Sequence, residues 1–182
     1  MQIGYVALRK LNPSGHGERQ NIVQSHGLSQ LREVVSLDSM LCPSVIQSLT
    51  EEDMRHKVHE FLAHDFFSDL SYLMKRVANE SQIEILAVLP EPTLAQVSQF
   101  NDPSFEFLGY ELIDTETRID PLLNCSTFKS LIPVEKLTNA GLISDFDKAR
   151  QIQKELTDKF PDHVHSETVL FAIWRKKIQA SG

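Results

Sequence analysis

The stretch from Phe105 to Ile113 constrains the fold most strongly, because it is apolar on both faces of an extended strand. One face carries Phe105, Phe107 and Ile113, and the other carries Leu108, Tyr110 and Leu112. Successive side chains of a strand point to opposite sides of its sheet. The pattern therefore predicts a central strand that is covered on both sides.

Four further segments are rich in β-branched and aliphatic residues, and they predict strands at 2–10, 31–41, 83–89 and 168–175. Turn-forming or helix-breaking residues delimit several of them. Asn12-Pro13-Ser14-Gly15 follows the first strand, and Pro90-Glu91-Pro92 follows the third.

The longest predicted helix begins at Thr50, whose hydroxyl can cap free amides before the acidic residues Glu51, Glu52 and Asp53. An apolar stripe then recurs every three or four residues: Met54, Val58, Leu62, Phe66, Leu70, Leu73 and Val77. We expect one helix to Val77, with a break near His64 as the alternative. Shorter helices are predicted at 93–100 and 146–160.

These elements predict a single α+β domain over residues 1–182, with a mixed, mainly antiparallel sheet of about five strands. Two or three helices would pack on that sheet. A doubly wound fold is the alternative, but no predicted strand is followed by a glycine-rich phosphate-binding turn.

The chain has no apolar run of the roughly 18 residues that a membrane-spanning helix needs, and its N-terminus lacks a signal-peptide pattern. We therefore expect a cytoplasmic protein without a membrane partner. In that compartment Cys42 and Cys125 are expected to remain thiols.

Charge is distributed unevenly along the chain. Between Val77 and Phe128 there are nine carboxylates and one cation, Arg118, whereas the whole chain has a net charge of −7. Such a surface would attract a cationic partner and repel nucleic acid. We predict a non-enzymatic acidic binding protein, and the narrower hypothesis is an inhibitor or immunity-type partner of a basic protein. Its expected binding residues are Glu106, Glu111, Asp114, Glu116 and Asp120. A soluble acidic surface without any partner is the alternative.

A second hypothesis is a small-ligand-binding protein or an enzyme whose cleft is formed by the two cysteine-containing segments. Its candidate residues are Asp38, Ser39, Cys42, Asn124 and Cys125, together with one histidine. For Ser36, Asp38 and Ser39 we favour ordinary turn chemistry, in which the side chains bond local amides.

Two groups of histidines raise the question of a metal. His56 and His59 lie 60° apart on a helix and could share an ion, but His64 falls on another side. His163 and His165 alone would make an incomplete site. We therefore predict neither a metal nor a cofactor, and we assign the first group to a solvated helix face.

Several stretches resemble a group of uncharacterised bacterial proteins of similar length. They are LREVVSLDSMLCPSV (31–45), FLGYELID (107–114), LLNC (122–125) and FAIWR (171–175). The resemblance implies a bacterial, single-domain, cytosolic protein, and it transfers no catalytic residue.

Overall fold

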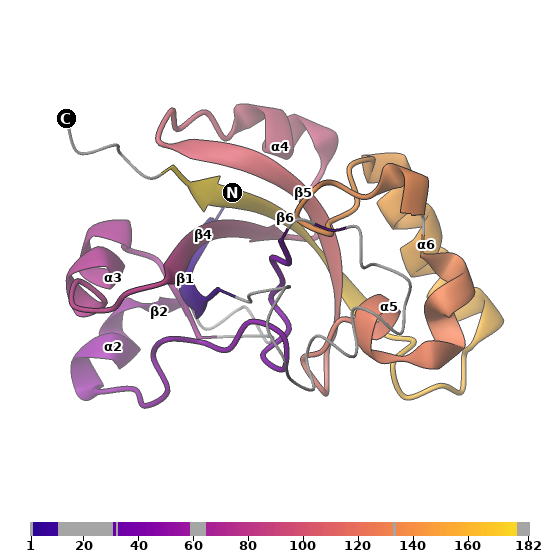
Figure 1. Ribbon diagram of the computed structural model, residues 1–182, viewed down its shortest axis with the longest axis horizontal. Helices are drawn as coiled ribbons and strands as arrows, with labels where there is room; N and C mark the ends of the chain where they lie inside the picture. Colours follow the sequence, from indigo (N-terminus) through magenta and orange to yellow (C-terminus); the bar gives the residue numbers. More distant parts are fainter. Residues whose placement is uncertain (1, 11–30, 32, 59–64, 133, 178–182) are drawn as a thin grey trace.

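The computed structural model describes residues 2–10, 31, 33–58, 65–132 and 134–177. Within these residues six strands form one sheet: β1 (Gly4–Arg9), β2 (Lys57–Val58), β3 (Phe66–Phe67), β4 (Ile83–Pro90), β5 (Phe105–Asp114) and β6 (Thr168–Lys176). The strand order is β2-β3-β1-β4-β6-β5, and every neighbouring pair is antiparallel (Figure 1). The predicted α+β class is confirmed, with six strands in place of the expected five.

The same residues contain five α-helices: α2 (Glu51–His56), α3 (Leu70–Arg76), α4 (Leu94–Gln99), α5 (Pro121–Asn124) and α6 (Phe146–Lys159). Two 3-10 helices, η1 (Ser126–Leu131) and η2 (Val134–Lys136), follow α5. In Figure 1, α2 and α3 lie beside one end of the sheet, and α5 and α6 lie beside the other. None of the described helices is both long enough and apolar enough to span a bilayer.

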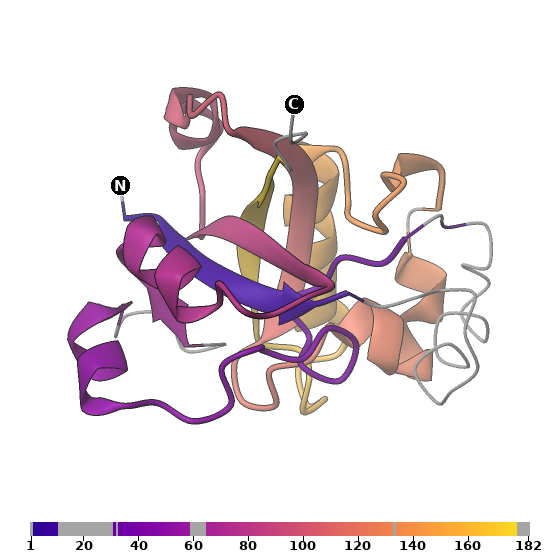
Figure 2. The ribbon, with the colours of Figure 1, turned by 60° about the vertical axis from the view of Figure 1, so that its left-hand side comes forward.

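One face of the sheet, the helical face, carries Tyr5, Ala7, Ala87, Ala172 and Trp174 and packs against helices. Leu73 and Val77 cover it from the α3 region, and three residues of α6 cover it at the β5 side. Figure 2 shows α6 lying along the sheet. This arrangement buries the apolar stripe of α6, as its 3.6-residue periodicity predicts.

The opposite face, the loop face, carries Val6, Leu8, Leu86, Val88 and Ile173. Residues 34–42 and 137–142 provide most of its cover, and they contribute several side chains to the same buried cluster, to which α5 adds Leu123. The loop face is therefore sealed by irregular backbone, which must find hydrogen-bond partners outside a regular ladder.

The single long helix predicted from Thr50 to Val77 is wrong. α2 ends at His56, and β2, β3 and α3 follow, while residues 59–64 lie outside the described part of the chain. Val58 and Phe66 are buried on the loop face, whereas Leu73 and Val77 are buried on the helical face. The apolar stripe thus belongs to both sides of a sheet, which one straight helix cannot reach.

The strand predicted over 31–41 is also wrong, because its described residues are irregular. The amide of Asp38 donates to Ser36 Oγ over 2.9 Å, and the amide of Met40 donates to Asp38 Oδ1 over 2.7 Å. This confirms the turn chemistry that we favoured for Ser36 and Asp38. Such local bonds compete with a strand ladder.

β5 is buried along most of its length, but it lies at the edge of the sheet and not at its centre. Tyr110 and Ile143 exchange two backbone hydrogen bonds of 2.8 Å across its outer edge. Gly109, with φ of +142°, permits this approach, because a Cβ there would lie 2.8 Å from the Ile143 carbonyl oxygen. Covering by residues around Ile143 explains why an edge strand has the composition of a central one.

Candidate functional site

The five carboxylates predicted as a binding surface occupy different environments. Glu111, Asp114 and Asp120 are buried, with exposed fractions of 2%, 0% and 5%. Glu106 lies on the surface with its Oε1 3.1 Å from Arg175 Nε, and Glu116 is exposed after β5. These five side chains therefore do not form the expected outward surface. The basic protein partner stays a prediction, and only Glu106 and Glu116 of the five are accessible to it.

Asp38, Glu111 and Asp120 come together in what we call the buried carboxylate cluster. Ser36 Oγ donates a hydrogen bond to Glu111 Oε1, and the amide of Leu37 donates to Glu111 Oε2 over 2.8 Å. The amide of Asp120 donates to Asp38 Oδ2 over 2.9 Å. The cluster thus ties the irregular covering segment to β5 and to the start of α5.

Burial controls the electrostatics of this cluster. Burial, and after it the charge of Asp38, raises the pKa of Asp120 to about 7, against the opposing effect of two amides that donate to it. Burial and the charge of Asp120 likewise raise the pKa of Glu111 well above its usual range. A cavity of about 10 Å³ beside Glu111 and Asp120 has room for about one water molecule. The cluster can hold protons, but it has no space for a substrate.

Asp114 closes the turn that follows β5. Its Oδ1 accepts hydrogen bonds from the amides of Glu116, over 3.0 Å, and Thr117, over 2.5 Å. Its buried Oδ2 has no hydrogen-bond partner and lies 3.7 Å from His165 Nδ1. Asp114 is therefore a turn-forming residue, and its one free oxygen faces a histidine.

Cys125 contacts the same histidine-containing loop, with its Sγ 3.7 Å from His163 Nε2. His163 Nδ1 accepts a hydrogen bond from the amide of His165 over 3.2 Å. A ring nitrogen that accepts carries no proton, so neutral His163 has its proton on Nε2, facing the sulfur. In that tautomer the imidazole cannot take up the thiol proton, as a nucleophile and base pair requires.

The predicted cleft between the two cysteine segments has no counterpart in these contacts. Cys42 and Cys125 are both thiols and form no disulfide, as expected. Cys42 is buried in the loop-face cluster, whereas Cys125 packs against the helical-face cluster. Ser39 is exposed, and Asn124 is the last residue of α5. Of this set, Asp38 contacts a residue of the other predicted site, because its Oδ2 accepts a hydrogen bond from Asp120 in the buried carboxylate cluster.

The side chain of His56 contacts Tyr72 and Glu52. Its ring stacks on Tyr72 with centroids 4.0 Å apart, and its Nε2 lies 3.4 Å from Glu52. His59 and His64 lie outside the described residues, so the structure does not place the hypothetical pair with His56. In the described part of the chain, no group of three or more His, Cys, Asp or Glu side chains could hold a metal ion.

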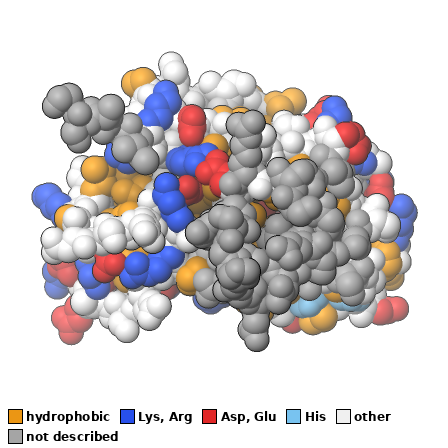
Figure 3. Space-filling model, in the orientation of Figure 1, with side chains coloured by type: hydrophobic (Ala, Val, Ile, Leu, Met, Phe, Trp, Pro, Cys, Tyr) orange, Lys and Arg blue, Asp and Glu red, His pale blue; other side chains and the backbone are white. Residues whose placement is uncertain are grey.

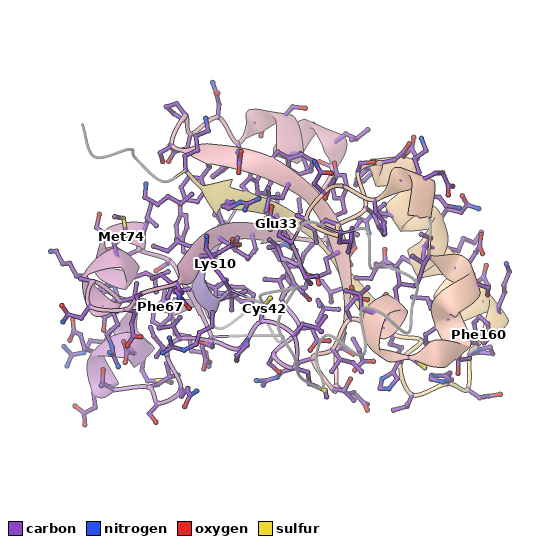
Figure 4. All side chains as sticks on the ribbon, in the orientation of Figure 1. Lys10, Glu33, Cys42, Phe67, Met74 and Phe160 are labelled. Carbon is purple, nitrogen blue, oxygen red and sulfur yellow. The ribbon has the colours of Figure 1, made fainter. Side chains whose placement is uncertain are left out.

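A groove of about 430 Å³ lies where β1 and β6 end and β4 and β5 begin. Four cationic side chains line this Arg175 groove, namely Lys10, Arg175, Lys176 and Lys177. Two carboxylates, Glu84 and Glu106, and the apolar pair Ile83 and Ile85 complete the lining. Figure 3 shows positive and negative side chains interleaved on this side of the molecule, and Figure 4 labels Lys10 and Glu33 there.

Arg175 is the centre of the charges in and around the groove. Its Nη1 and Nη2 donate to the two carboxylate oxygens of Glu33 over 2.8 and 2.7 Å, and Nη1 also lies 3.4 Å from Glu84. Hydrogen bonding to Arg175 lowers the pKa of Glu33. Burial raises the pKa of Glu84, although Arg175 and Lys10 act in the opposite direction. The groove therefore holds both a guanidinium that binds carboxylates and a buried carboxylate whose pKa is raised.

The sequence patterns above do not indicate this groove. The basic run Arg175-Lys176-Lys177 stands in the sequence only as the end of the strand predicted at 168–175. The lining residues lie in four strands or directly after them, and these strand ends meet only because the sheet places β1, β4, β6 and β5 next to one another. Charged residues at the ends of several predicted strands were the available signal, but strand order was needed to bring them together.

Comparison with protein-family models, with curated proteins and with solved structures finds no match to this chain. We therefore argue its function from the geometry and charge of the residues described above.

Proposed function

We propose that this chain is a non-enzymatic small-ligand-binding protein that holds an anionic molecule with an apolar body in the Arg175 groove. The observation that carries the proposal is that four cationic residues line one groove of about 430 Å³, with Ile83 and Ile85 as the apolar part of the lining. Small-molecule sites of this size combine apolar contact area with a few polar groups that fix orientation.

Charge supports an anion as the ligand. Four cations against two carboxylates give the lining an excess of positive charge, on a protein whose net charge is −7. A carboxylate or a phosphate monoester would be attracted to this local field, whereas a cation would be repelled. A polynucleotide is a poorer fit, because its affinity depends on a longer track of basic residues.

Binding is better supported than catalysis. The lining residues are lysines, an arginine, two glutamates and two isoleucines, and they include no hydroxyl or thiol nucleophile. Glu84 is the one buried acid among them, and its nearest cations are Lys10 and Arg175. Because Glu84 lies between two cations, it is better suited to holding their side chains in place than to transferring a proton to a substrate.

The test uses three probes that share a benzene ring and differ in charge: benzoate, phenyl phosphate and benzylamine. Their binding is followed by NMR of the isoleucine methyl groups in the full chain. We expect benzoate and phenyl phosphate to shift the Ile83 and Ile85 signals with dissociation constants below about 1 mM. Added salt should weaken binding, because the lysines are partly exposed. Benzylamine should leave the signals unchanged.

Charge-removing variants localise the effect. Lys176→Gln and Lys177→Gln should each weaken the binding of the anions several-fold. Lys154→Gln, which removes the same charge from an exposed position on α6, should not change it. The proposal fails if none of the anions shifts the two isoleucines, or if benzylamine binds as tightly as benzoate.

A further inference from the structure

We infer that Glu33 is a built-in competitor for the Arg175 groove: its carboxylate occupies the edge of Arg175 that a ligand's carboxylate or phosphate would use. The inference rests on the proposed function and adds to it a ligand chemistry and a means of regulation. The ligand is an anion with two oxygens that can bind a guanidinium side by side, and its binding requires Glu33 to leave.

Glu33 contacts Arg175 with the geometry expected of a bound anionic ligand. Both carboxylate oxygens of Glu33 accept hydrogen bonds from Arg175, at 2.7 Å from Nη2 and 2.8 Å from Nη1. Paired bonds of this kind are the usual way in which arginine recognises carboxylates and phosphates. Glu106 approaches a different atom, Nε, at 3.1 Å. The edge formed by Nη1 and Nη2 is therefore the one that an incoming anion would need, and Glu33 holds it.

Of the two carboxylates that contact Nη1 and Nη2, Glu33 is the one that can leave at the lower cost. Its side chain is 37% exposed, whereas Glu84, on strand β4, is only 9% exposed. Glu33 comes from the irregular segment that covers the loop face. The adjacent Val34 and Val35 are buried in the core.

A second anchor keeps the covering segment in place when Glu33 is released. The amide of Leu37 donates to the buried carboxylate of Glu111 over 2.8 Å. Rotation of the Glu33 side chain into solvent therefore breaks the contact with Arg175 without detaching the backbone. Two states result, one with Glu33 on Arg175 and one in which this edge keeps only the 3.4 Å contact between Nη1 and Glu84 and can accept a ligand.

This competition has a measurable consequence. A ligand that binds only the open state has an apparent dissociation constant equal to the intrinsic value divided by the open fraction. If Glu33 occupies Arg175 about nine-tenths of the time, removing its charge lowers the apparent dissociation constant about tenfold. If Glu33 only stabilised the groove, removing its charge would loosen the groove. The apparent dissociation constant would then rise or stay unchanged.

The experiment compares wild type with Glu33→Gln, by NMR titration of the Ile83 and Ile85 methyl groups with benzoate and with phenyl phosphate. We expect Glu33→Gln to bind at least one probe about tenfold more tightly. The matched control is Glu80→Gln, which removes the same charge from a pair with Arg9 at an exposed position that does not touch Arg175. It measures the gain that comes from net charge alone, and backbone NMR spectra establish that both variants are folded.

The outcomes separate the two proposals. If wild type binds the anions and Glu33→Gln binds no more tightly than Glu80→Gln, the competitor role is overturned while the proposed function stands. If neither wild type nor Glu33→Gln binds either probe, the proposed function fails and the competitor role fails with it. A gain confined to benzoate assigns the ligand as a carboxylate, and a gain confined to phenyl phosphate assigns it as a phosphate.

Discussion

Asp120 shows how one buried carboxylate links the fold to pH. Its pKa is about 7 in the folded chain, against 3.8 for an exposed aspartate. Between these two values the folded state binds more protons than the unfolded state, so the free energy of unfolding falls as pH rises. The stabilisation associated with this group is fully present below about pH 4 and is lost as pH rises through about 7. Glu111, whose pKa is also raised, acts in the same direction.

Replacing Asp120 by Asn tests this linkage. Asn retains an oxygen that can accept from the amides of Leu122 and Leu123, which are 2.7 and 3.2 Å from Asp120 Oδ1. We expect Asp120→Asn to be more stable than wild type at pH 8 by about 1–3 kcal/mol, and closer to it at pH 5. Urea unfolding between pH 5 and 8 measures the difference. The control Asp158→Asn, at an exposed position on α6, should keep the wild-type slope. Equal slopes for wild type and Asp120→Asn would show that Asp120 titrates as if exposed.

At the scale of elements, Asp53 joins α2 to α3. Its carboxylate accepts from the Thr50 amide and hydroxyl, both at 2.8 Å, from the Tyr72 hydroxyl at 2.7 Å and from Arg76 Nε at 3.2 Å. Burial opposes ionisation, but the bonds from Thr50 and Tyr72, together with the charge of Arg76, lower the pKa of Asp53 to about 2. Its contribution to stability is therefore present above about pH 4 and is lost as pH falls towards 2.

We expect Asp53→Asn to lower the free energy of unfolding by about 1–3 kcal/mol at pH 7, because one oxygen cannot satisfy all of these donors. Urea unfolding followed by circular dichroism measures the loss. Glu52→Gln is the matched control on the same helix, since Glu52 pairs with Arg55 in solvent, and it should change stability by less than about 0.5 kcal/mol. An equally small effect at Asp53 would mean that the two helices do not depend on this junction.

Element starts were easier to predict than element identities, and Thr50 and Phe66 show why. The cap at Thr50 is a local pattern, and the structure has a helix there with the expected reciprocal bonds to Asp53. The stripe that follows also fits a helix, but Phe66 and Phe67 are consecutive and both fully buried. Adjacent large side chains are buried on opposite faces only in a strand. That pair was the local signal for β3, and the 3.6-residue periodicity around it concealed it.

At the scale of the whole molecule, the carboxylates between Val77 and Phe128 make separate contacts that a count along the sequence cannot show. Glu80 pairs with Arg9, Glu91 with Arg150 and Glu106 with Arg175. Composition correctly indicated where carboxylates are dense along the chain, but the fold places several of them in ion pairs and others in the interior, and leaves Glu116 exposed. The same strand order creates the Arg175 groove, which is why sequence patterns predicted the α+β class but not the site.

Strand order also predicts how stability is distributed over the molecule. β4 pairs with β1 and β6, and β6 pairs with β4 and β5, so both are flanked on two sides, whereas β2 lies at the edge and has two residues. Amides of β4 and β6 should therefore exchange with solvent only on global unfolding, and those of β2 and β3 through local opening. Native-state hydrogen exchange in increasing urea distinguishes the two modes, because global unfolding depends strongly on urea and local opening does not. If β2 is as protected as β6, then the interactions of α2 and α3 would stabilise that edge more than its short ladder indicates.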